Sequence, residues 1–304
     1  MRLVTFSAGG RVAPGAVVGD RIVSLAGVLS ELTRRNPDAA SRLANAACDI
    51  TRLLLLDGPG LETVRTELSR IERDWQPEQH LAGTAVELLA PVPRPGKIVA
   101  VGRNYADHAA ETGVKPFEKP RIIAKLSSSV CGPGTVVGRP TGVAKMDYEV
   151  ELAVVIGRSA KDVARVAALE YVMGYTILND VSAREFQFDV APAQTTFAKS
   201  MDGFCPMGPW TVTADQLGDP QDLELRLWVN GDLLQEGHTR DMIFDVATLI
   251  EYLSRYMTLE PGDIIATGTP AGVGAFRTPP RWLQPGDRLA LEISRIGRLE
   301  HSIG

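Results

Sequence analysis

Two glutamates separated by a single residue stand in an otherwise apolar stretch, DYEVELAVVIG, which runs from position 147 to 157. Alternate side chains of a strand share a face, so Glu149 and Glu151 would lie together on one side of it. Buried like charges repel each other and lose hydration unless an opposite charge or a metal ion holds them. A strand with a half-solvated polar face is the simpler alternative, and the pair alone does not decide between the two.

A third acidic residue, Asp180, lies in YTILNDVSAREFQ, where a strand would end in a turn. An aspartate at such a place is ordinarily a turn or helix-cap residue. With Glu149 and Glu151 it would make an all-oxygen set that has no histidine or cysteine nearby. Hard cations prefer such ligands, so we expect Mg²⁺, with Mn²⁺ or Ca²⁺ as alternatives, and Zn²⁺ much less readily.

His108 and Glu111, in VGRNYADHAAETG, would face each other on one helical turn because they are three residues apart. A carboxylate that holds the proton on one imidazole nitrogen leaves the other nitrogen free to act as a general base. A surface ion pair at the start of a helix is the alternative, and it is the commoner case without further context. The HExxH spacing of zinc proteases is absent.

Hydrogen-bond donors lie in two further segments. Lys199 stands in TTFAKSMDGFCPMGPW, which has few other charges, although most lysines are solvated. Arg184 and Gln187, one helical turn apart in SAREFQ, would present donors to an oxyanion or carboxylate. The glycine-rich turn ATGTPAGVG carries Thr267 and Thr269 but does not match a phosphate-binding loop. The sequence has no GxSxG nucleophile motif.

Strands and turns beyond residue 88 must position these side chains. Strand candidates cover 134–140, 149–157, 175–181, 210–217, 224–237 and 263–269. Asn230 and Gly231 predict a type I′ hairpin, and Gly297 divides a second hairpin over 288–303. Amphipathic helices are expected over 163–175 and 245–256. Because strands do not alternate regularly with helices, a mostly β core with a few covering helices fits better than a doubly wound sheet.

The N-terminal part has a different character. Residues 1–25 read as short strands broken by glycines, and helices are expected over 25–35, 41–56 and 61–75. A proline-rich linker around Pro91, Pro93 and Pro95 then leads into the apolar strand KIVAVG. We therefore expect a small N-terminal α+β domain over 1–87 and a catalytic domain over 88–304.

Composition limits the class of protein. The 304 residues are 44% hydrophobic and 23% charged with a net charge of −5, so we expect no nucleic-acid partner. Apolar runs are too short to span a membrane, and no signal peptide is evident. The cysteines (Cys48, Cys131 and Cys205) are odd in number and widely separated, which argues against a disulfide framework and fits a reducing cytoplasm.

Five segments in the order GRNYADHAAE, DYEVELAVVIG, NDVSAREFQ, KSMDGFCPMGPW and GDIIATGTPAGVG together resemble the fumarylacetoacetate hydrolase family. The resemblance covers roughly residues 88–304, and the N-terminal region is similar to that of longer bacterial members. It implies an α+β, mostly β fold with a mixed β-roll catalytic domain. It also implies a homodimer, because members of the family are typically dimeric.

The resemblance implies roles for individual residues. Glu149, Glu151 and Asp180 match the metal-binding pattern of the family, and Lys199 matches the lysine near the metal. These four residues would form the metal end of the site.

The remaining matches concern catalysis and substrate contact. His108 and Glu111 match a dyad on a lid segment that orders when ligand binds. Arg184 and Gln187 match a substrate-contacting pair, and Thr267 matches the threonine of the GTP loop.

Family activities comprise hydrolysis of acylpyruvates and related diketo acids, decarboxylation of oxaloacetate, isomerisation of hydroxymuconate-type dioates, and lyase reactions. The resemblance implies a divalent-metal hydrolase that cleaves a C–C bond of a small 2,4-diketo acid in the catabolism of aromatic compounds. The alternatives are a decarboxylase or an isomerase that uses the same site, and a non-catalytic binding protein, which would be expected to lack the dyad or the lysine. The motifs do not identify the distal group of the substrate.

Overall fold

The computed structural model describes residues 1–43, 58–74, 86–113 and 115–304. Its N-terminal part contains β1 (Arg2–Ala8), β2 (Arg11–Val18), β3 (Arg21–Ser24), α1 (Leu25–Arg35), α2 (Pro37–Leu43), α4 (Gly58–Arg73) and β4 (Val86–Leu88). The strands expected over 1–25 and the helices expected over 25–35 and 61–75 are therefore present, within a few residues. The helix expected over 41–56 lies almost entirely outside the described residues.

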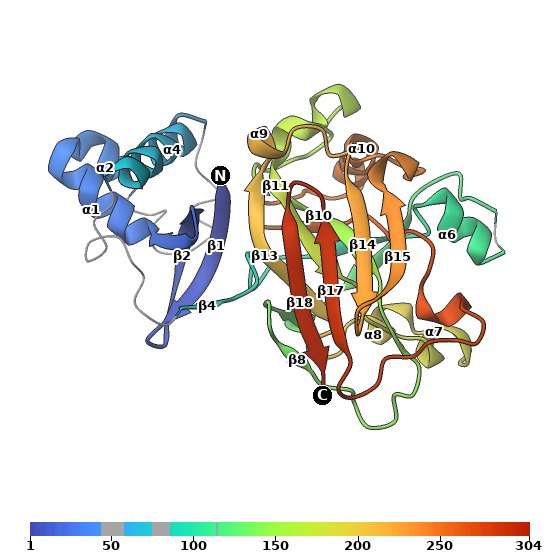
Figure 1. The fold of residues 1–304 in the computed structure, drawn as a ribbon. Helices are drawn as coiled ribbons and strands as arrows, with labels where there is room; N and C mark the ends of the chain where they lie inside the picture. Colours follow the sequence, from blue (N-terminus) through green and yellow to red (C-terminus); the bar gives the residue numbers. More distant parts are fainter. Residues whose placement is uncertain (44–57, 75–85, 114) are drawn as a thin grey trace.

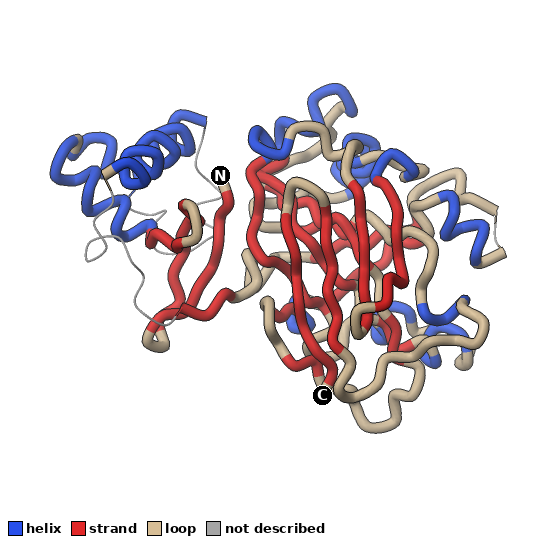
Figure 2. The backbone as a smooth tube through the Cα atoms, in the orientation of Figure 1, coloured by secondary structure: helices blue, strands red, loops and turns tan. Residues whose placement is uncertain are grey.

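The rest of the chain is dominated by strands (Figure 2). Its first half contains β5 (Ile98–Gly102), α6 (Ala106–Glu111), β6 (Arg121–Lys125), η1 (Ser127–Ser129), β7 (Val130–Cys131), β8 (Val136–Val137), β9 (Met146–Asp147), β10 (Val150–Ile156), η2 (Arg165–Tyr171), β11 (Val172–Asn179) and β12 (Ser182–Ala183). Its second half contains α7 (Glu185–Phe188), α8 (Thr195–Ala198), β13 (Cys205–Thr213), α9 (Ala214–Leu217), β14 (Glu224–Val229), β15 (Asp232–His238), η3 (Thr239–Asp241), α10 (Val246–Tyr256), β16 (Ile264–Ala266), η4 (Gly274–Phe276), β17 (Arg288–Ile293) and β18 (Gly297–Ile303).

Two sheets carry the fold (Figure 1). The larger has eleven strands along the path β3-β2-β1-β13-β11-β10-β16-β5-β6, with β4 paired to β1 and β7 to β13. The smaller has five strands in the order β15-β14-β17-β18-β8 and lies in front in Figure 1. The expected α+β, mostly β architecture is confirmed.

Strand β10 runs through the middle of the larger sheet and is buried along its whole length. Leu152 and Val154 on one face belong to the main buried cluster. Ala153 and Val155 on the other face belong to a second cluster. The alternation expected from the sequence is therefore present, but both faces are covered, so β10 is not the half-solvated strand of the simpler alternative.

The N-terminal strands extend the larger sheet. Strand β1 pairs antiparallel with β13, where Arg2 lies opposite Val212. Val28 of α1 and Leu68 of α4 belong to the same buried cluster as Val155 of β10. The N-terminal segment thus continues the sheet and one of its cores, and the domain boundary near residue 88 stays a prediction.

Local signals account for the hairpins and the main helix. Asn230 and Gly231 have φ angles of 53° and 91°, as a type I′ turn between β14 and β15 requires. Helix α10 starts after Asp245, whose side chain accepts a hydrogen bond from the Thr248 amide at 2.7 Å.

The prediction of a helix over 163–175 is wrong. A 3₁₀ segment, η2, occupies Arg165–Tyr171, and β11 begins at Val172. Strand β11 pairs with β10 on one side and β13 on the other. A Cβ at Gly174 would lie 2.2 Å from the Val212 carbonyl oxygen, so glycine permits this close pairing. Pairing on both edges overrides the helical periodicity of the segment.

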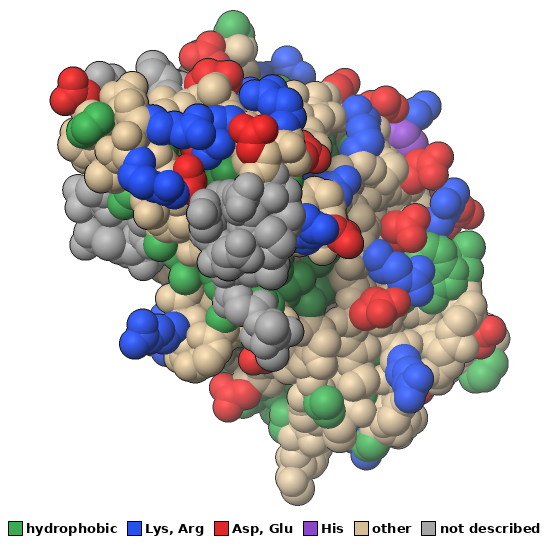
Figure 3. Space-filling model, turned by 60° about the vertical axis from the view of Figure 1, so that its left-hand side comes forward, with side chains coloured by type: hydrophobic (Ala, Val, Ile, Leu, Met, Phe, Trp, Pro, Cys, Tyr) green, Lys and Arg blue, Asp and Glu red, His purple; other side chains and the backbone are tan. Residues whose placement is uncertain are grey.

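Charges of both signs are interspersed on the face shown in Figure 3, which includes the N-terminal part. One contact across this region joins Arg65 of α4 to Asp215 of α9 at 2.6 Å. Within the described residues, no helix has both the length and the apolar character needed to cross a membrane.

Candidate active site

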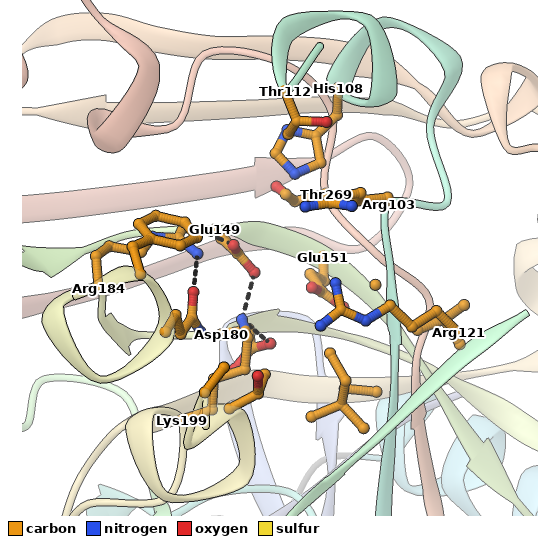
Figure 4. Close-up of a pocket in the computed structure, with 18 of the residues that line it drawn as sticks. Arg103, His108, Thr112, Arg121, Glu149, Glu151, Asp180, Arg184, Lys199 and Thr269 are labelled. Carbon is orange, nitrogen blue, oxygen red and sulfur yellow. Dashed lines mark hydrogen bonds and ion pairs between the residues drawn. The ribbon is translucent and has the colours of Figure 1, made fainter. Parts of the chain in front are cut away.

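A pocket of about 160 Å³ opens where β5, β6, β10 and β11 meet the short helices α6 and α7 (Figure 4). Its lining comprises the acidic side chains, His108, several cationic groups and the aromatic ring of Phe276. The residues that bear charge are Arg103, Arg121, Glu149, Glu151, Asp180, Arg184 and Lys199. Distant parts of the sequence therefore contribute to one cavity.

Antiparallel pairing of β10 and β11 brings the three predicted acidic residues together. Asn179 lies opposite Val150, so the Asp180 amide donates to the Glu149 carbonyl at 2.9 Å. Glu149, Glu151 and Asp180 are 6%, 2% and 1% exposed. One carboxylate oxygen from each lies within 4.8 Å of the others. Asp180 lies 29 positions after Glu151 and 31 after Glu149, so the pairing of the two strands brings the expected cluster together.

Lys199 bridges two of these carboxylates. Its ammonium donates to Glu149 Oε2 at 2.8 Å, to Asp180 Oδ2 at 2.6 Å and to Ser182 Oγ at 2.8 Å. These bonds use all three donors of the ammonium. Burial opposes its charged form, but the Asp180 and Glu149 carboxylates outweigh burial and raise the pKa of Lys199. Lys199 is therefore a buried, ionised part of the site.

Arg184 holds the other oxygen of Glu149, with Nη2 donating to Oε1 at 2.7 Å. Burial alone would raise the pKa of Glu149, but the Lys199 and Arg184 charges overcome burial and lower it to about 2. Glu149 is thus fixed as a carboxylate.

Glu151 is the least compensated member of the cluster. Its Oε2 accepts a hydrogen bond from the Gly268 amide at 2.8 Å. Burial, together with the Asp180 and Glu149 carboxylates, raises the pKa of Glu151 well above its usual value. Asp180 Oδ1 accepts no well-aligned hydrogen bond within the described part of the chain, although the Lys125 ammonium lies 2.8 Å away.

The donor set fits a hard divalent cation. It offers three buried carboxyl groups close together, and the protein stabilises the ionised form of one of them, Glu151, only weakly. Two ligand oxygens of one Mg²⁺ or Ca²⁺ lie at most roughly 4–5 Å apart, and the three carboxylate oxygens here, all within 4.8 Å of one another, satisfy this limit. Such an ion would offset the repulsion that burial intensifies.

Two buried charged residues at this site were missed by the sequence analysis. Lys125 of β6 has a fully buried side chain and contacts Asp180. Asp147 of β9 accepts from Arg184 Nε at 2.8 Å and from the Gly274 and Ala275 amides at 2.7 and 3.0 Å. A lysine at the end of the apolar stretch RIIAK and an aspartate opening DYEVE were the available signals.

A second set of hydrogen bonds joins the backbone of Glu149 to Asn179 and His301. Asn179 Oδ1 accepts the Glu149 amide at 2.9 Å, and Asn179 Nδ2 lies 2.9 Å from His301 Nε2. His301 is 4% exposed, and burial lowers its pKa to about 4. The ring is therefore neutral at physiological pH, with Nε2 accepting from Asn179.

His108 and Glu111 form the expected pair on α6. His108 Nδ1 lies 3.0 Å from Glu111 Oε2, and Glu111 Oε1 accepts the Gly272 amide at 2.9 Å. A carboxylate at Nδ1 favours the tautomer in which Nε2 is unprotonated. His108 lines the pocket, and Figure 4 shows its ring on the side opposite Lys199, with Glu149 between them. The dyad thus faces the acidic cluster.

The predicted substrate contacts divide into two groups. Arg184 and Gln187 line the pocket, where Arg184 Nη1 donates to Gln187 Oε1 at 3.0 Å. Gln187 Nε2 is buried without a hydrogen-bond partner among the described residues. Thr267 is not brought into the pocket, because its hydroxyl donates to the Leu152 carbonyl at 2.8 Å. Thr269 lines the pocket in its place.

The family follows from comparison with known sequences. The fumarylacetoacetate (FAA) hydrolase C-terminal family matches residues 97–304. The chain therefore belongs to the fumarylacetoacetate hydrolase family, whose members include enzymes that act on small oxo acids.

Relatives cover most of the chain. A protein of Burkholderia multivorans is 41% identical over 298 residues, which are 98% of this chain and 96% of that protein. The mitochondrial oxaloacetate tautomerase of Xenopus laevis is 38% identical over 257 residues, 84% of this chain and 78% of that protein.

Solved structures share the fold along its full length. Maleylpyruvate hydrolase of Sphingobium sp. SYK-6, in complex with manganese(II) ion and pyruvate, is 32% identical with a TM-score of 0.76, covering 100% of this chain and 98% of that one. The 5-carboxymethyl-2-hydroxymuconate delta-isomerase of Mycobacterium smegmatis is 33% identical with a TM-score of 0.72 and the same coverage. Similar proteins thus include a hydrolase, an isomerase and a tautomerase, so the reaction must be argued from the site.

Proposed function

We propose that this protein is a divalent-metal-dependent hydrolase that cleaves the C–C bond of an acylpyruvate or a related 2,4-diketo acid. The observation that carries the proposal is the His108–Glu111 pair facing the buried carboxylates across one pocket. A general base and an electrophilic centre on opposite sides of a substrate are what hydrolysis of a diketo acid requires.

The acidic cluster would hold the ion. Glu149, Glu151 and Asp180 supply its ligands, with Mg²⁺ or Mn²⁺ preferred by this oxygen set. When bound, the ion supplies Lewis-acid polarisation of the 2-oxo acid end of the substrate. The manganese and pyruvate in the similar maleylpyruvate hydrolase support this assignment.

Cationic and amide groups would orient the same end of the substrate. Arg184 and Lys199 are held rigidly by Asp147, Glu149 and Asp180. Gln187 Nε2 has no other partner in the described residues and is free to donate to a substrate oxygen. The fixed positive charges of Arg184 and Lys199, together with the Gln187 donor, would stabilise negative charge that develops during reaction.

His108 would perform the proton transfer. Glu111 holds the Nδ1 proton, so Nε2 accepts a proton from water as the water oxygen adds to the distal carbonyl carbon. The bond from that carbon to the methylene group then breaks, its electron pair goes to the methylene carbon, and a proton completes the methyl group of pyruvate. The other product is a carboxylic acid. The ring of Phe276 lies 6.3 Å from that of His108 and lines the same pocket.

The second candidate is a tautomerase or decarboxylase of an oxaloacetate-like acid, or an isomerase of a 2-hydroxy-diene-dioate. The 38% identity to an oxaloacetate tautomerase over 84% of this chain supports it. All of these reactions need the same acidic site, and they differ in whether water is activated.

The test is to incubate purified protein and Mg²⁺ with acetylpyruvate, fumarylpyruvate, oxaloacetate and a hydroxymuconate-like dioate, and to follow ultraviolet absorbance. Pyruvate and a carboxylic acid from a diketo acid support the hydrolase. Turnover of oxaloacetate or the dioate alone supports the second candidate. Activity that is unaffected by a chelator would contradict both.

A variant tests the assignment of the base. His108→Ala should keep the fold and bind the metal but lose hydrolysis by roughly 10²–10⁴-fold. Near-wild-type turnover by this variant on a good acylpyruvate would exclude His108 as the group that activates water.

A further inference from the structure

Two arginines of the pocket have no acidic partner among the residues that the structure describes. Arg184, Lys199 and Lys125 each form an ion pair with a carboxylate of the site. Arg103 and Arg121 also belong to the cavity, Arg103 as a lining residue on the turn after β5 and Arg121 at the start of β6. No carboxylate lies within ion-pair distance of either one in the described ranges of the chain. Their charges are available to a ligand.

The two guanidinium groups are neighbours. Burial and the adjacent Arg121 charge lower the pKa of Arg103. Arg103 is half-buried and lies over the ring of Phe117, 5.7 Å from its centroid, whereas Arg121 is exposed at the rim. Figure 4 shows both side chains entering from the wall opposite Arg184. Two like charges converging on one cavity favour an anion between them.

The backbone is shaped for this arrangement. Arg103 has a φ of 58°, a left-handed conformation that is uncommon for residues with a side chain and that clusters at ligand sites. Gly102 pairs with Arg121 across the β5–β6 ladder. A Cβ at Gly102 would lie 3.2 Å from Ile123 Cδ1 and 3.4 Å from Arg121 Cδ, so glycine leaves room for the stem of Arg121.

Side chains on one face of strand β6 run from the acidic cluster to the other end of the pocket. Arg121, Ile123 and Lys125 alternate along it and therefore share one face. Lys125 contacts Asp180 at the metal end, and Arg121 lies about 13 Å further along the strand at 3.3 Å per residue. Ile123, between them, lines the pocket. A ligand along this face meets a charged end, an apolar middle and a second charged end.

We propose that Arg103 and Arg121 bind a second carboxylate of the substrate, so that the site selects 2-oxo dicarboxylic acids over 2-oxo acids with an apolar distal end. This inference rests on the proposed function, because it assumes that the 2-oxo acid end lies at the acidic cluster. Arg103 and Arg121 are then specificity-determining residues.

The probes are two non-cleavable acids of equal length in the presence of Mg²⁺. 2-Oxoadipate ends in a carboxylate, whereas 2-oxohexanoate ends in a methyl group. Calorimetry should show that the wild-type protein binds 2-oxoadipate about 10- to 100-fold more tightly, the expected effect of a charge-assisted hydrogen bond to a charged group. Arg103→Gln and Arg121→Gln should each remove most of that preference and leave the affinity for 2-oxohexanoate unchanged.

The matched control is Arg158→Gln. Arg158 also lies over an aromatic ring, 5.5 Å from the centroid of Tyr171, but it is outside the pocket. The control should retain the wild-type preference. Equal wild-type affinities, binding of neither acid, or equal weakening of both acids by the pocket variants would overturn the proposal.

The turnover assay separates this inference from the proposed function. A selective preference for 2-oxoadipate without turnover of any diketo acid would keep the dicarboxylate site and reject the hydrolase. Turnover of acylpyruvates with equal binding of the two probes would keep the hydrolase and reject the dicarboxylate site.

Discussion

His301 should make the stability of the protein depend on pH between its pKa in the folded chain and its pKa in the unfolded chain. The ring is 4% exposed, and burial lowers its pKa from 6.5 to about 4. The unfolded chain therefore binds a proton between these pH values that the folded chain does not bind. The free energy of unfolding should be fully retained above pH 6.5 and should fall as the pH falls toward 4.

The magnitude follows from the two pKa values. The pKa of His301 differs between 6.5 in the unfolded chain and about 4 in the folded chain. At 1.36 kcal/mol for each pKa unit, this difference lowers the free energy of unfolding by about 3 kcal/mol over the full pH range. About 2 kcal/mol of this should be lost between pH 7.5 and pH 5. Glu149, whose pKa is lowered to about 2, contributes little in this interval, because its unfolded value is already below pH 5.

The assay is urea unfolding with a chelator present at pH 7.5 and pH 5, comparing the wild type with His301→Gln. Glutamine retains an oxygen that can accept from Asn179 but has no proton to gain. The variant should lose about 2 kcal/mol less than the wild type over the interval. Equal losses in the two proteins would show that His301 is protonated in the folded state as readily as in the unfolded chain.

Further predictions concern the site itself. Glu149→Ala should abolish Mg²⁺ binding, and with it the roughly 3 kcal/mol of stabilisation that Mg²⁺ at 100 times its Kd gives the wild type. An unchanged Mg²⁺ affinity in calorimetry would show that Glu149 is not a ligand. Glu236→Ala, at an exposed position, is the control. Asp147→Asn should lower the free energy of unfolding in denaturant by about 3 kcal/mol. This is the low end for a broken buried ion pair, because Arg184 keeps Glu149 as a partner. Asp202→Asn, at an exposed position, is the control and should not change the free energy of unfolding measurably. Glu111→Gln should slow hydrolysis by roughly 10²-fold because His108 remains but loses its orienting carboxylate; a pH–rate profile identical to that of the wild type would contradict this role.

Much of the fold and part of the site could be predicted from local sequence patterns. Alternation in β10, the Asn230–Gly231 turn and helix α10 are all decided by near neighbours, and they were predictable for that reason. The segment 163–175 was not, because Gly174 and its neighbours are held by pairing with β10 and β13. That pairing joins residues far apart in sequence and outweighs the local helical pattern.

The site shows the same division. The spacing of Glu149 and Glu151 and that of His108 and Glu111 suggested candidate pairs, but the roles of these residues came from the family resemblance. Lys125 and Asp147 were overlooked, because a lysine that ends an apolar stretch and an aspartate that opens one are also common at solvated strand ends. Only the register of β6 and β9 against their neighbours buries these two side chains at the cluster.

The position of the dyad depends on the acidic end of the site through the backbone. Asp147 accepts the Gly274 amide as well as the Arg184 guanidinium, and Glu111 accepts the Gly272 amide two residues earlier in the same loop. The loop that contains Gly272 and Gly274 is thus linked to Arg184 through Asp147 and to the dyad through Glu111. The proposed hydrolysis would require His108 to reach a water beside the distal carbonyl. We therefore infer that the contacts of this loop set the distance between the proposed base and the acidic cluster in this protein.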